Sequence, residues 1–337
     1  MSETVSAEHP FAAYVRILGK GKSGSRSLTQ SEAREAFSMI LKDAVEPLQL
    51  GAFLMLLRVK EESAAELAGF VEACRDTMIS PPASISAELD WSSYAGKKHQ
   101  HPWYILSMLL LAEAGYRVFI HGAGGHTPGR LYTGDALQQL GLSTAQNWQD
   151  VEQQLAEQNF SYLALNKFSS ALYDLLQLKP LLGLRSPVNT LTRMLNPLQA
   201  PASIQSIFHP AYALLHQDCD ALLEQHSSLV FKGDSGEVEI RPHADTRLML
   251  QFNGQPLSRE LPRTLTERAA AVAQPSVEPL QALWLEQREE AYGLLATLST
   301  TAAALLLLEP SLSNQSAMAR AKELWQNRKQ ETLARAT

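Results

Sequence analysis

Hydrophobic residues in the first quarter of the chain recur with the 3.6-residue period of an α-helix. One stripe follows the capping-box pattern Thr29-x-x-Glu32, and another follows Ser63-x-x-Glu66. Four helices are therefore predicted before any strand, over residues 10–18, 29–41, 47–60 and 63–78. They define an N-terminal α-helical subdomain, residues 1–80.

From Asp90 onward, short apolar segments alternate with helical ones. Strands are predicted at 118–120, 162–165, 203–207 and 229–231, and an antiparallel pair is predicted within 237–252. Such alternation is typical of a mainly parallel, doubly wound sheet. The predicted fold class is α/β, with residues 81–337 as the larger domain. Helical segments at 171–195 are expected to join the helical subdomain in space, and residues 277–308 and 316–332 are predicted to be helical.

Composition narrows the possible functions. The 337 residues carry a formal net charge of −6, so binding of nucleic acid or phosphate needs a local basic patch. The two cysteines, Cys74 and Cys219, have no metal or redox spacing, which favours a reducing compartment. The polar start lacks an apolar signal core, and the apolar run at 301–308 is too short to cross a bilayer. We expect a cytoplasmic protein without a membrane partner.

Two loops follow the predicted strands and are the places where ligands are expected. They span Ser92–His101 and His121–Thr133, separated by the apolar helix 105–112. In an open α/β sheet, ligands bind beyond the carboxyl ends of the strands. The residues of these two loops therefore decide the functional interpretation.

Several motifs, in order along nearly the whole chain, resemble the anthranilate phosphoribosyltransferase-like proteins, glycosyl transferase family 3. The resemblance implies a helical subdomain on an α/β domain, a homodimer formed through that subdomain, and phosphoribosyl transfer with magnesium. The motifs are Leu50-Gly51-Ala52-Phe53-Leu54, Asp90, His121-Gly122, Ala136-Leu137 to Leu140-Gly141, Gly183-x-Arg185-Ser186-Pro187-x-Asn189 to Asn196-Pro197, Phe208-His209-Pro210, and Gly236-x-x-Glu239-Ile240.

Three elements of that chemistry depart from the family pattern. The family's G-T-G-G-D loop, whose backbone N–H groups hold pyrophosphate, corresponds to Ser93-Tyr94-Ala95-Gly96-Lys97. The K-H-G-N-R loop keeps only His121 and Gly122 of its five residues. The magnesium-holding acidic pair corresponds to Val238 and Glu239, and valine cannot ligate a metal. We therefore expect little or no transferase activity with the usual donor.

The first loop also resembles the divergent YbiB-type branch of the family, which implies sequence-independent nucleic-acid binding. Lys97 and Lys98 are expected at a helix N-terminus, where phosphate oxygens meet cations and free N–H groups. The predicted contacts are Tyr94, Gly96, Lys97, Lys98, His99 and Gln100. The leading hypothesis is a non-catalytic binder of DNA or RNA that needs neither a cofactor nor a metal. Its plainer alternative is a solvated basic loop.

The alternative from the enzyme class is a pentosyltransferase with an anthranilate-like aromatic acceptor. Under it, His121, Gly122 and Arg185 form the acceptor pocket, and Glu239 holds magnesium beside phosphoribosyl pyrophosphate. A histidine metal site is disfavoured because no pair has H-x-x-x-H spacing with an acidic partner. Gly122-Ala123-Gly124-Gly125 also lacks the G-x-G-x-x-G pattern of a dinucleotide site.

Overall fold

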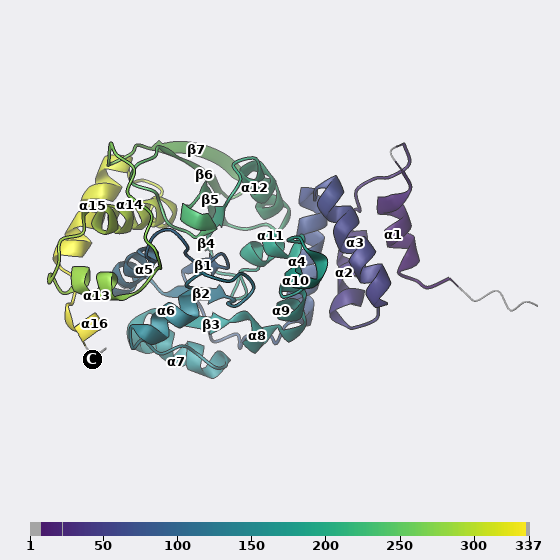
Figure 1. Cartoon of the computed structure of the whole chain (residues 1–337), viewed down its shortest axis with the longest axis horizontal. Helices are drawn as coiled ribbons and strands as arrows, with labels where there is room; N and C mark the ends of the chain where they lie inside the picture. Colours follow the sequence, from purple (N-terminus) through teal and green to yellow (C-terminus); the bar gives the residue numbers. More distant parts are fainter. Residues whose placement is uncertain (1–7, 22, 335–337) are drawn as a thin grey trace, which may run out of the picture.

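The N-terminal residues form the predicted four-helix bundle (Figure 1). The computed structural model describes residues 8–21 and 23–334, so most of the polar N-terminal start and Lys22 lie outside it. The helices are α1 (Ala12–Gly19), α2 (Gln30–Leu41), α3 (Pro47–Lys60) and α4 (Ala64–Thr77). Both predicted capping boxes are confirmed, because the hydroxyls of Thr29 and Ser63 accept the backbone N–H groups of Glu32 and Glu66.

The remaining chain builds a seven-stranded sheet in the order β3-β2-β1-β4-β5-β6-β7. Strands β1 to β5 are parallel, whereas β6 and β7 are antiparallel to their neighbours. Their bounds are β1 (Leu89–Ser93), β2 (Val118–Gly122), β3 (Phe160–Ala164), β4 (Ala202–Ile207), β5 (Ser227–Lys232), β6 (Thr246–Phe252) and β7 (Gln255–Leu261). The predicted mainly parallel α/β architecture is confirmed.

The antiparallel pair predicted within residues 237–252 is wrong in its partners. Strand β6 pairs with β5 on one side and with β7 on the other. Residues 237–240 contain no strand. All four are buried, and they belong to the site described below. The alternation of Val238 and Ile240 reflects burial in the core beside the sheet instead.

Helices cover both faces of the sheet. Those described are α5 (Tyr104–Glu113), α6 (Thr133–Gln139), α7 (Trp148–Gln158), α8 (Leu165–Phe168), α9 (Ser170–Leu176), α10 (Lys179–Leu182), α11 (Val188–Leu191), η1 (Thr192–Met194), α12 (Tyr212–Leu222), η2 (Asp234–Gly236), α13 (Glu278–Trp284), α14 (Ala291–Leu308), α15 (Asn314–Gln326) and α16 (Glu331–Ala334). Figure 1 shows α9 to α11 beside α4, and Leu172 and Leu191 share a buried cluster with Phe70 of α4.

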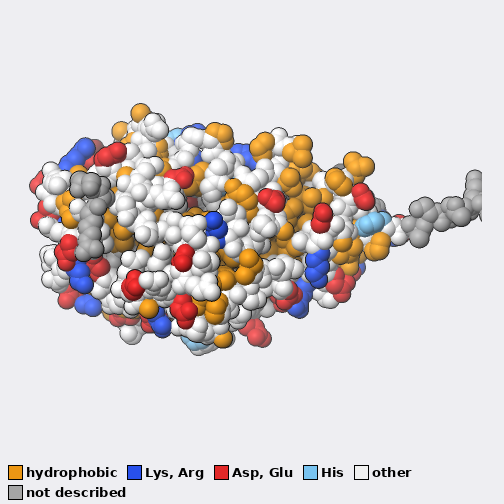
Figure 2. All heavy atoms as spheres, turned by 90° about the horizontal axis from the view of Figure 1, so that it is seen from below, with side chains coloured by type: hydrophobic (Ala, Val, Ile, Leu, Met, Phe, Trp, Pro, Cys, Tyr) orange, Lys and Arg blue, Asp and Glu red, His pale blue; other side chains and the backbone are white. Residues whose placement is uncertain are grey.

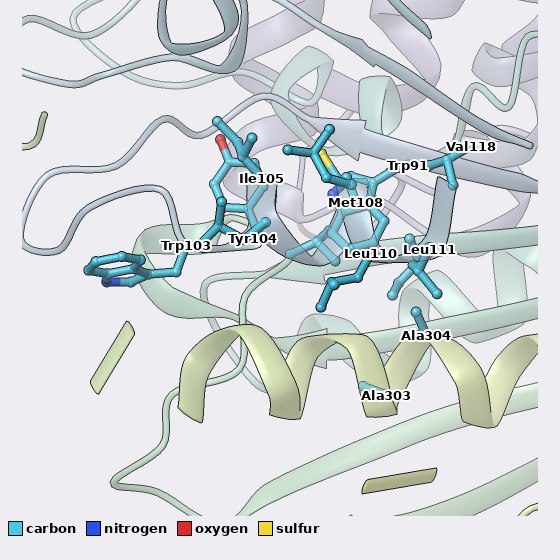
Figure 3. Close-up of a cluster of buried hydrophobic side chains, with 14 of the residues drawn as sticks. Trp91, Trp103, Tyr104, Ile105, Met108, Leu110, Leu111, Val118, Ala303 and Ala304 are labelled. Atoms are coloured by element: carbon cyan, nitrogen blue, oxygen red, sulfur yellow. The ribbon is translucent and has the colours of Figure 1, made fainter. Parts of the chain in front are cut away.

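One face of the sheet packs against the two most apolar helices, α5 and α14. Figure 3 shows Leu110 and Leu111 of α5 between Trp91 and Val118 of the strands and Ala303 and Ala304 of α14. Helix α14 is 18 residues long and apolar enough to cross a membrane, but 78% of it is buried inside the protein. It is therefore a core helix, whose alanines allow close contact with α5.

Candidate functional site

The first loop, between β1 and α5, lies inside the protein for most of its length. Tyr94, Gly96 and Lys97 are buried. Backbone hydrogen bonds at 2.8 and 2.9 Å join Lys97 to Leu131 of the second loop. The two loops at the carboxyl ends of β1 and β2 are therefore one connected structure.

Lys97 does not lie on the surface, and α5 begins only at Tyr104, which corrects the prediction that Lys97 and Lys98 stand at a helix N-terminus. Its side chain is fully buried, and its ammonium forms ion pairs with Asp234 and Glu239. Both acids follow β5, more than 130 positions away in sequence. A buried ammonium is tolerated only when carboxylates compensate it, so these acids are the physical reason for its position.

Opposing effects set the charges of this buried group. Burial lowers the pKa of Lys97, but the charges of Glu239 and Asp234 outweigh it and raise that pKa above its ordinary value. Burial raises the pKa of Asp234, yet the neighbouring Lys97 ammonium lowers it overall. Burial raises the pKa of Glu239 to about 7 against the opposing effect of Lys97. Lys97 is therefore a charged lysine held by acids of its own chain.

A third acid, Glu237, accepts hydrogen bonds from backbone N–H groups of the first loop. Its Oε1 accepts hydrogen bonds from the backbone of Ala95 at 2.7 Å and of Gly96 at 2.5 Å. Its Oε2 accepts from the Ser93 hydroxyl at 2.8 Å. The φ of +68° at Gly96 turns the two N–H groups toward one point, as in an anion-binding nest. We call Ser93, Ala95 and Gly96 the first-loop nest; Glu237 fills it.

Arg193 holds the segment that carries Glu237. Its Nη1 donates to the carbonyl of Gly236 at 2.7 Å and to that of Ser206. Arg130, in the second loop, holds the first loop instead. Its Nη1 donates at 2.9 Å to the carbonyls of Ala95 and Gly96. Burial raises the pKa of Glu237, whereas the nest and Arg193 oppose that rise. The filled nest is thus fixed from several sides.

Magnesium, which the fold family implies, does not fit these residues. Among residues 8–21 and 23–334, the carboxylates that pair with Lys97 are Asp234 and Glu239, and both already contact its ammonium. Val238 supplies no ligand atom at the position between Glu237 and Glu239. In the described part of the chain no group of three or more His, Cys, Asp or Glu side chains is arranged to hold a metal. A divalent cation here would lie beside a positive charge.

Two of the three residues predicted for an acceptor pocket are in the core instead. His121 is fully buried, with Nδ1 2.6 Å from the Tyr94 hydroxyl and Nε2 3.3 Å from Asp90 Oδ1. Gly122 permits close packing, since a Cβ there would lie 2.1 Å from the Ser93 carbonyl oxygen. Tyr94 is likewise 3% exposed and not available to stack on a base. In this structure the three residues pack within and between the two loops.

Arg185 is the predicted pocket residue that does line a cleft. This cleft, of about 130 Å³, lies between the helical bundle and the loop after β4. Burial lowers the pKa of Arg185, and the charge of Arg130 lowers it further. The cleft is lined by Arg58, Glu62, Arg185, Ser186, Asn189, Thr190, Arg193, Ile207, Phe208, His209, Tyr212 and His216. We call it the Arg185 cleft.

Cations gather next to this cleft around His126. Burial, together with the charges of Arg185, Arg130 and Lys179, lowers the pKa of His126 to about 4. Arg130, Lys179 and Arg185 are named the cationic cluster. Sequence reasoning missed Arg130 and Lys179 because they lie in different segments.

The rest of the predicted basic loop divides between surface and interior. Lys98 and His99 are exposed. Gln100 is 9% exposed, and its side-chain amide donates to the Ala270 carbonyl at 2.7 Å. The sequence did contain a signal for the acids that neutralise Lys97. Three carboxylates lie close together within Asp234-Ser235-Gly236-Glu237-Val238-Glu239, a density that could have indicated a buried cation nearby.

Comparisons with known proteins agree with this architecture. Residues 14–78 match the model "Glycosyl transferase family, helical bundle domain", and residues 105–329 match "Glycosyl transferase family, a/b domain". YbiB of Escherichia coli (strain K12) is 27% identical over 262 residues, 75% of this chain and 78% of YbiB. Anthranilate phosphoribosyltransferase of Haloarcula marismortui is 28% identical over 220 residues, 65% of this chain and 66% of that enzyme.

The solved structures show the same fold at lower sequence identity. Anthranilate phosphoribosyltransferase from Saccharomyces cerevisiae in complex with PRPP and Mg superposes with a TM-score of 0.77 and 17% identity. The superposition covers 98% of this chain and 96% of that one. The bundle, the mostly parallel sheet and the two matched domains together place the chain in the glycosyl transferase family, as an anthranilate phosphoribosyltransferase-like protein of the YbiB type.

Proposed function

We propose that this chain is a non-catalytic member of its family that binds nucleic acid without sequence preference. The observation that carries the non-catalytic part is the filled donor site. Glu237 occupies the first-loop nest, and Lys97 lies between the two acids that remain for a metal. Both positions that donor and magnesium need are taken by side chains of the chain itself.

Displacing these side chains is costly. A pyrophosphate group entering the nest has to remove Glu237 from two backbone donors and the Ser93 hydroxyl, leaving a buried carboxylate without partners. An unsatisfied buried charge costs several kcal/mol, about as much as a phosphate gains from the same donors. Exchange at this site therefore has little driving force.

The cationic cluster is the better candidate for phosphate contact. Arg185 has no carboxylate within salt-bridge distance in the part of the chain that is described, and Lys179 contacts only the Thr127 hydroxyl, at 3.5 Å. Arg58 reaches the Arg185 cleft from α3. Because the whole chain is acidic, a local group of cations has to supply the attraction. On the face in Figure 2, cations and anions are intermixed.

Anisotropy of a labelled oligonucleotide tests this proposal. The wild type is expected to bind, with an affinity that falls steeply between about 50 and 200 mM salt. Lys179→Glu/Arg185→Glu is expected to bind at least about tenfold more weakly and with a smaller salt slope. Lys42→Glu/Lys322→Glu reverses two exposed lysines on α2's C-terminal end and on α15, and it is the matched control. Equal binding by the two double variants removes the cluster from the proposal, and no binding by the wild type removes the function.

The second candidate function is pentosyl transfer to an aromatic acceptor. Arg185, Asn189 and Phe208 favour it, because they place a guanidinium, an amide and a half-exposed ring around one cleft. If the chain is a pentosyltransferase, it must release pyrophosphate from phosphoribosyl pyrophosphate when magnesium and an aromatic acid are present. Turnover across an acceptor panel would support this candidate against the first. Release at the level of the buffer alone would support the non-catalytic proposal.

The proposal includes a homodimer formed through the helical bundle and a cytoplasmic location. On α3, Leu48 is 88% exposed and Val59 is 83% exposed, an unusual exposure for large aliphatic side chains. Figure 2 shows hydrophobic atoms gathered on the right, over the N-terminal helices. Both cysteines are free and buried, as suits a reducing compartment.

A further inference from the structure

A second depression lies on the other side of the turn that carries Phe208. It has a volume of about 340 Å³ and is bounded by the carboxyl ends of β4 and β5, the start of β6 and helix α12. We call it the α12 pocket. Its lining is Ile207, Pro210, Ala211, Ala213, Leu214, Phe231, Lys232, Arg241, Asp245, Thr246, Arg247 and Met249.

The floor of the α12 pocket is apolar. Ile207, Phe231 and Met249 are 3%, 0% and 7% exposed, so they present a closed hydrophobic surface. Leu214 stands at the rim with 60% of its surface exposed. Pockets of this size with an apolar lining and a few polar groups are typical small-ligand sites. The floor therefore suits a flat, apolar group.

The polar groups of the α12 pocket are mostly cations. Lys232, Arg241 and Arg247 line it against a single acid, Asp245, whose Oδ1 accepts the Arg263 backbone N–H at 2.8 Å. Among the described residues, none of the three cations has a carboxylate within salt-bridge distance. The Nε of Arg241 is buried there without a hydrogen-bond partner. These unpaired cations above an apolar floor favour a ligand that has both a negative charge and an apolar part.

We propose that the α12 pocket receives one unstacked base of a single-stranded nucleic acid, with the adjacent phosphate held by Lys232 and Arg241. This inference rests on the proposed function. Ile207 lines both the α12 pocket and the Arg185 cleft, so the two depressions adjoin. Phe208, 50% exposed on the turn between them, offers a ring on which a neighbouring base stacks.

The consequence is a preference for single strands. A base can enter the pocket only when it leaves its stack and its pairing partner, which costs a few kcal/mol in a duplex and much less in a single strand. The cationic cluster attracts the phosphates of both forms, and it attracts the duplex at least as strongly because the duplex has the higher charge density. A preference for single strands over duplexes therefore indicates that the α12 pocket is used. The overall affinity for nucleic acid indicates how strongly the cationic cluster binds phosphate.

The experiment measures anisotropy for three labelled probes of equal length: a single strand, a duplex, and a strand of abasic deoxyribose phosphates. The wild type is expected to bind the single strand about tenfold more tightly than the other two. Ala213→Phe fills the pocket from α12 and is expected to remove that difference, whereas Ala319→Phe, exposed on α15, is its control. Lys232→Gln/Arg241→Gln is expected to weaken single-strand binding more than Lys42→Gln/Lys322→Gln does, because Lys42 and Lys322 are exposed away from the pocket.

The outcomes separate the two proposals. If the wild type binds none of the probes, the proposed function fails. If it binds all three equally, or if Ala213→Phe keeps the single-strand preference, the function stands and the base pocket is overturned. A thermal melt of each variant shows whether lost binding reflects lost folding.

Discussion

Lys97 and Glu239 form an ion pair in which both side chains are fully buried. Asp234 contacts the same ammonium from the 3₁₀ turn η2, so the pair is a triad with one cation and two acids. Tyr104, at the start of α5, donates its backbone N–H to the other oxygen of Glu239 at 2.9 Å. The triad thus joins the first loop, the segment after β5 and helix α5.

Replacing Lys97 by methionine should strongly destabilise the fold. The change leaves two acids together in a buried site, and removing one partner of a buried pair typically costs about 3–5 kcal/mol. Urea unfolding monitored by circular dichroism measures the loss. Lys98→Met, at the exposed neighbour, should change the free energy of unfolding by less than about 0.5 kcal/mol. Equal stability of the two variants would mean that Lys97 is not held as described.

Replacing Glu237 by alanine should open the first-loop nest to an external anion. The variant frees the N–H groups of Ala95 and Gly96 and the Ser93 hydroxyl, and it removes a negative charge beside Arg193. Calorimetric titration with pyrophosphate is expected to show at least about tenfold tighter binding than in the wild type. Glu157→Ala, on the exposed face of α7, is the control. An unchanged affinity would show that the nest is not anion-competent.

His216 should make the fold less stable in acid. Burial lowers its pKa to about 3, with Arg193 as a further cause, and its Nδ1 lies 2.8 Å from the Gln205 amide oxygen. Below its ordinary pKa of about 6.5 the unfolded chain takes up a proton that the folded chain does not, so stability falls as the pH falls. The loss approaches about 1.4 kcal/mol for each pH unit from about 6.5 toward 3.

The variant His216→Gln isolates this effect. Asp220, whose pKa burial raises to about 6, contributes the opposite slope below that pH and accepts hydrogen bonds from the same Gln205 amide that lies beside His216. Glutamine at position 216 can still bond to Gln205, so the difference between the two proteins is expected to come mainly from His216. Urea unfolding at several pH values should show a smaller loss toward acid for His216→Gln than for the wild type. Parallel curves for the two proteins would contradict the assignment.

Charges placed on the outer face of α3 should separate the proposed homodimer. Leu48→Glu/Val59→Glu is expected to sediment as a monomer at concentrations where the wild type sediments as a dimer, because desolvating two new charges opposes association. Leu181→Glu, at a position 82% exposed on α10, is the control and should remain dimeric. A monomeric wild type would contradict the assembly itself.

Most of the fold followed from local patterns. The capping boxes at Thr29 and Ser63 marked the starts of α2 and α4 to the residue, because a cap is a contact over three positions. The strands β2, β3, β4 and β5 were each found within a few residues of their ends. Strand β7 was missed, since most of its residues are exposed at the sheet edge and leave no apolar run.

The site followed less well from the sequence because its contacts are long-range. Lys97 looked like a surface lysine next to Lys98, and only the folded chain brings Asp234 and Glu239 to it. His121 and Gly122 were recognised as special positions, but their roles are packing against Tyr94 and Ser93. That Lys98 and His99 contact nucleic acid, and that Arg185 contacts an acceptor, stay predictions.

The filled nest and the buried triad also couple the effects of substitutions at positions 97 and 237. An acid in place of Lys97 would gather three carboxylates around one point, together with Asp234 and Glu239, while Glu237 still occupies the nest. Removing Glu237 alone would leave the Lys97 ammonium between its two acids. The two substitutions are therefore expected to be non-additive, because neither one alone clears both positions.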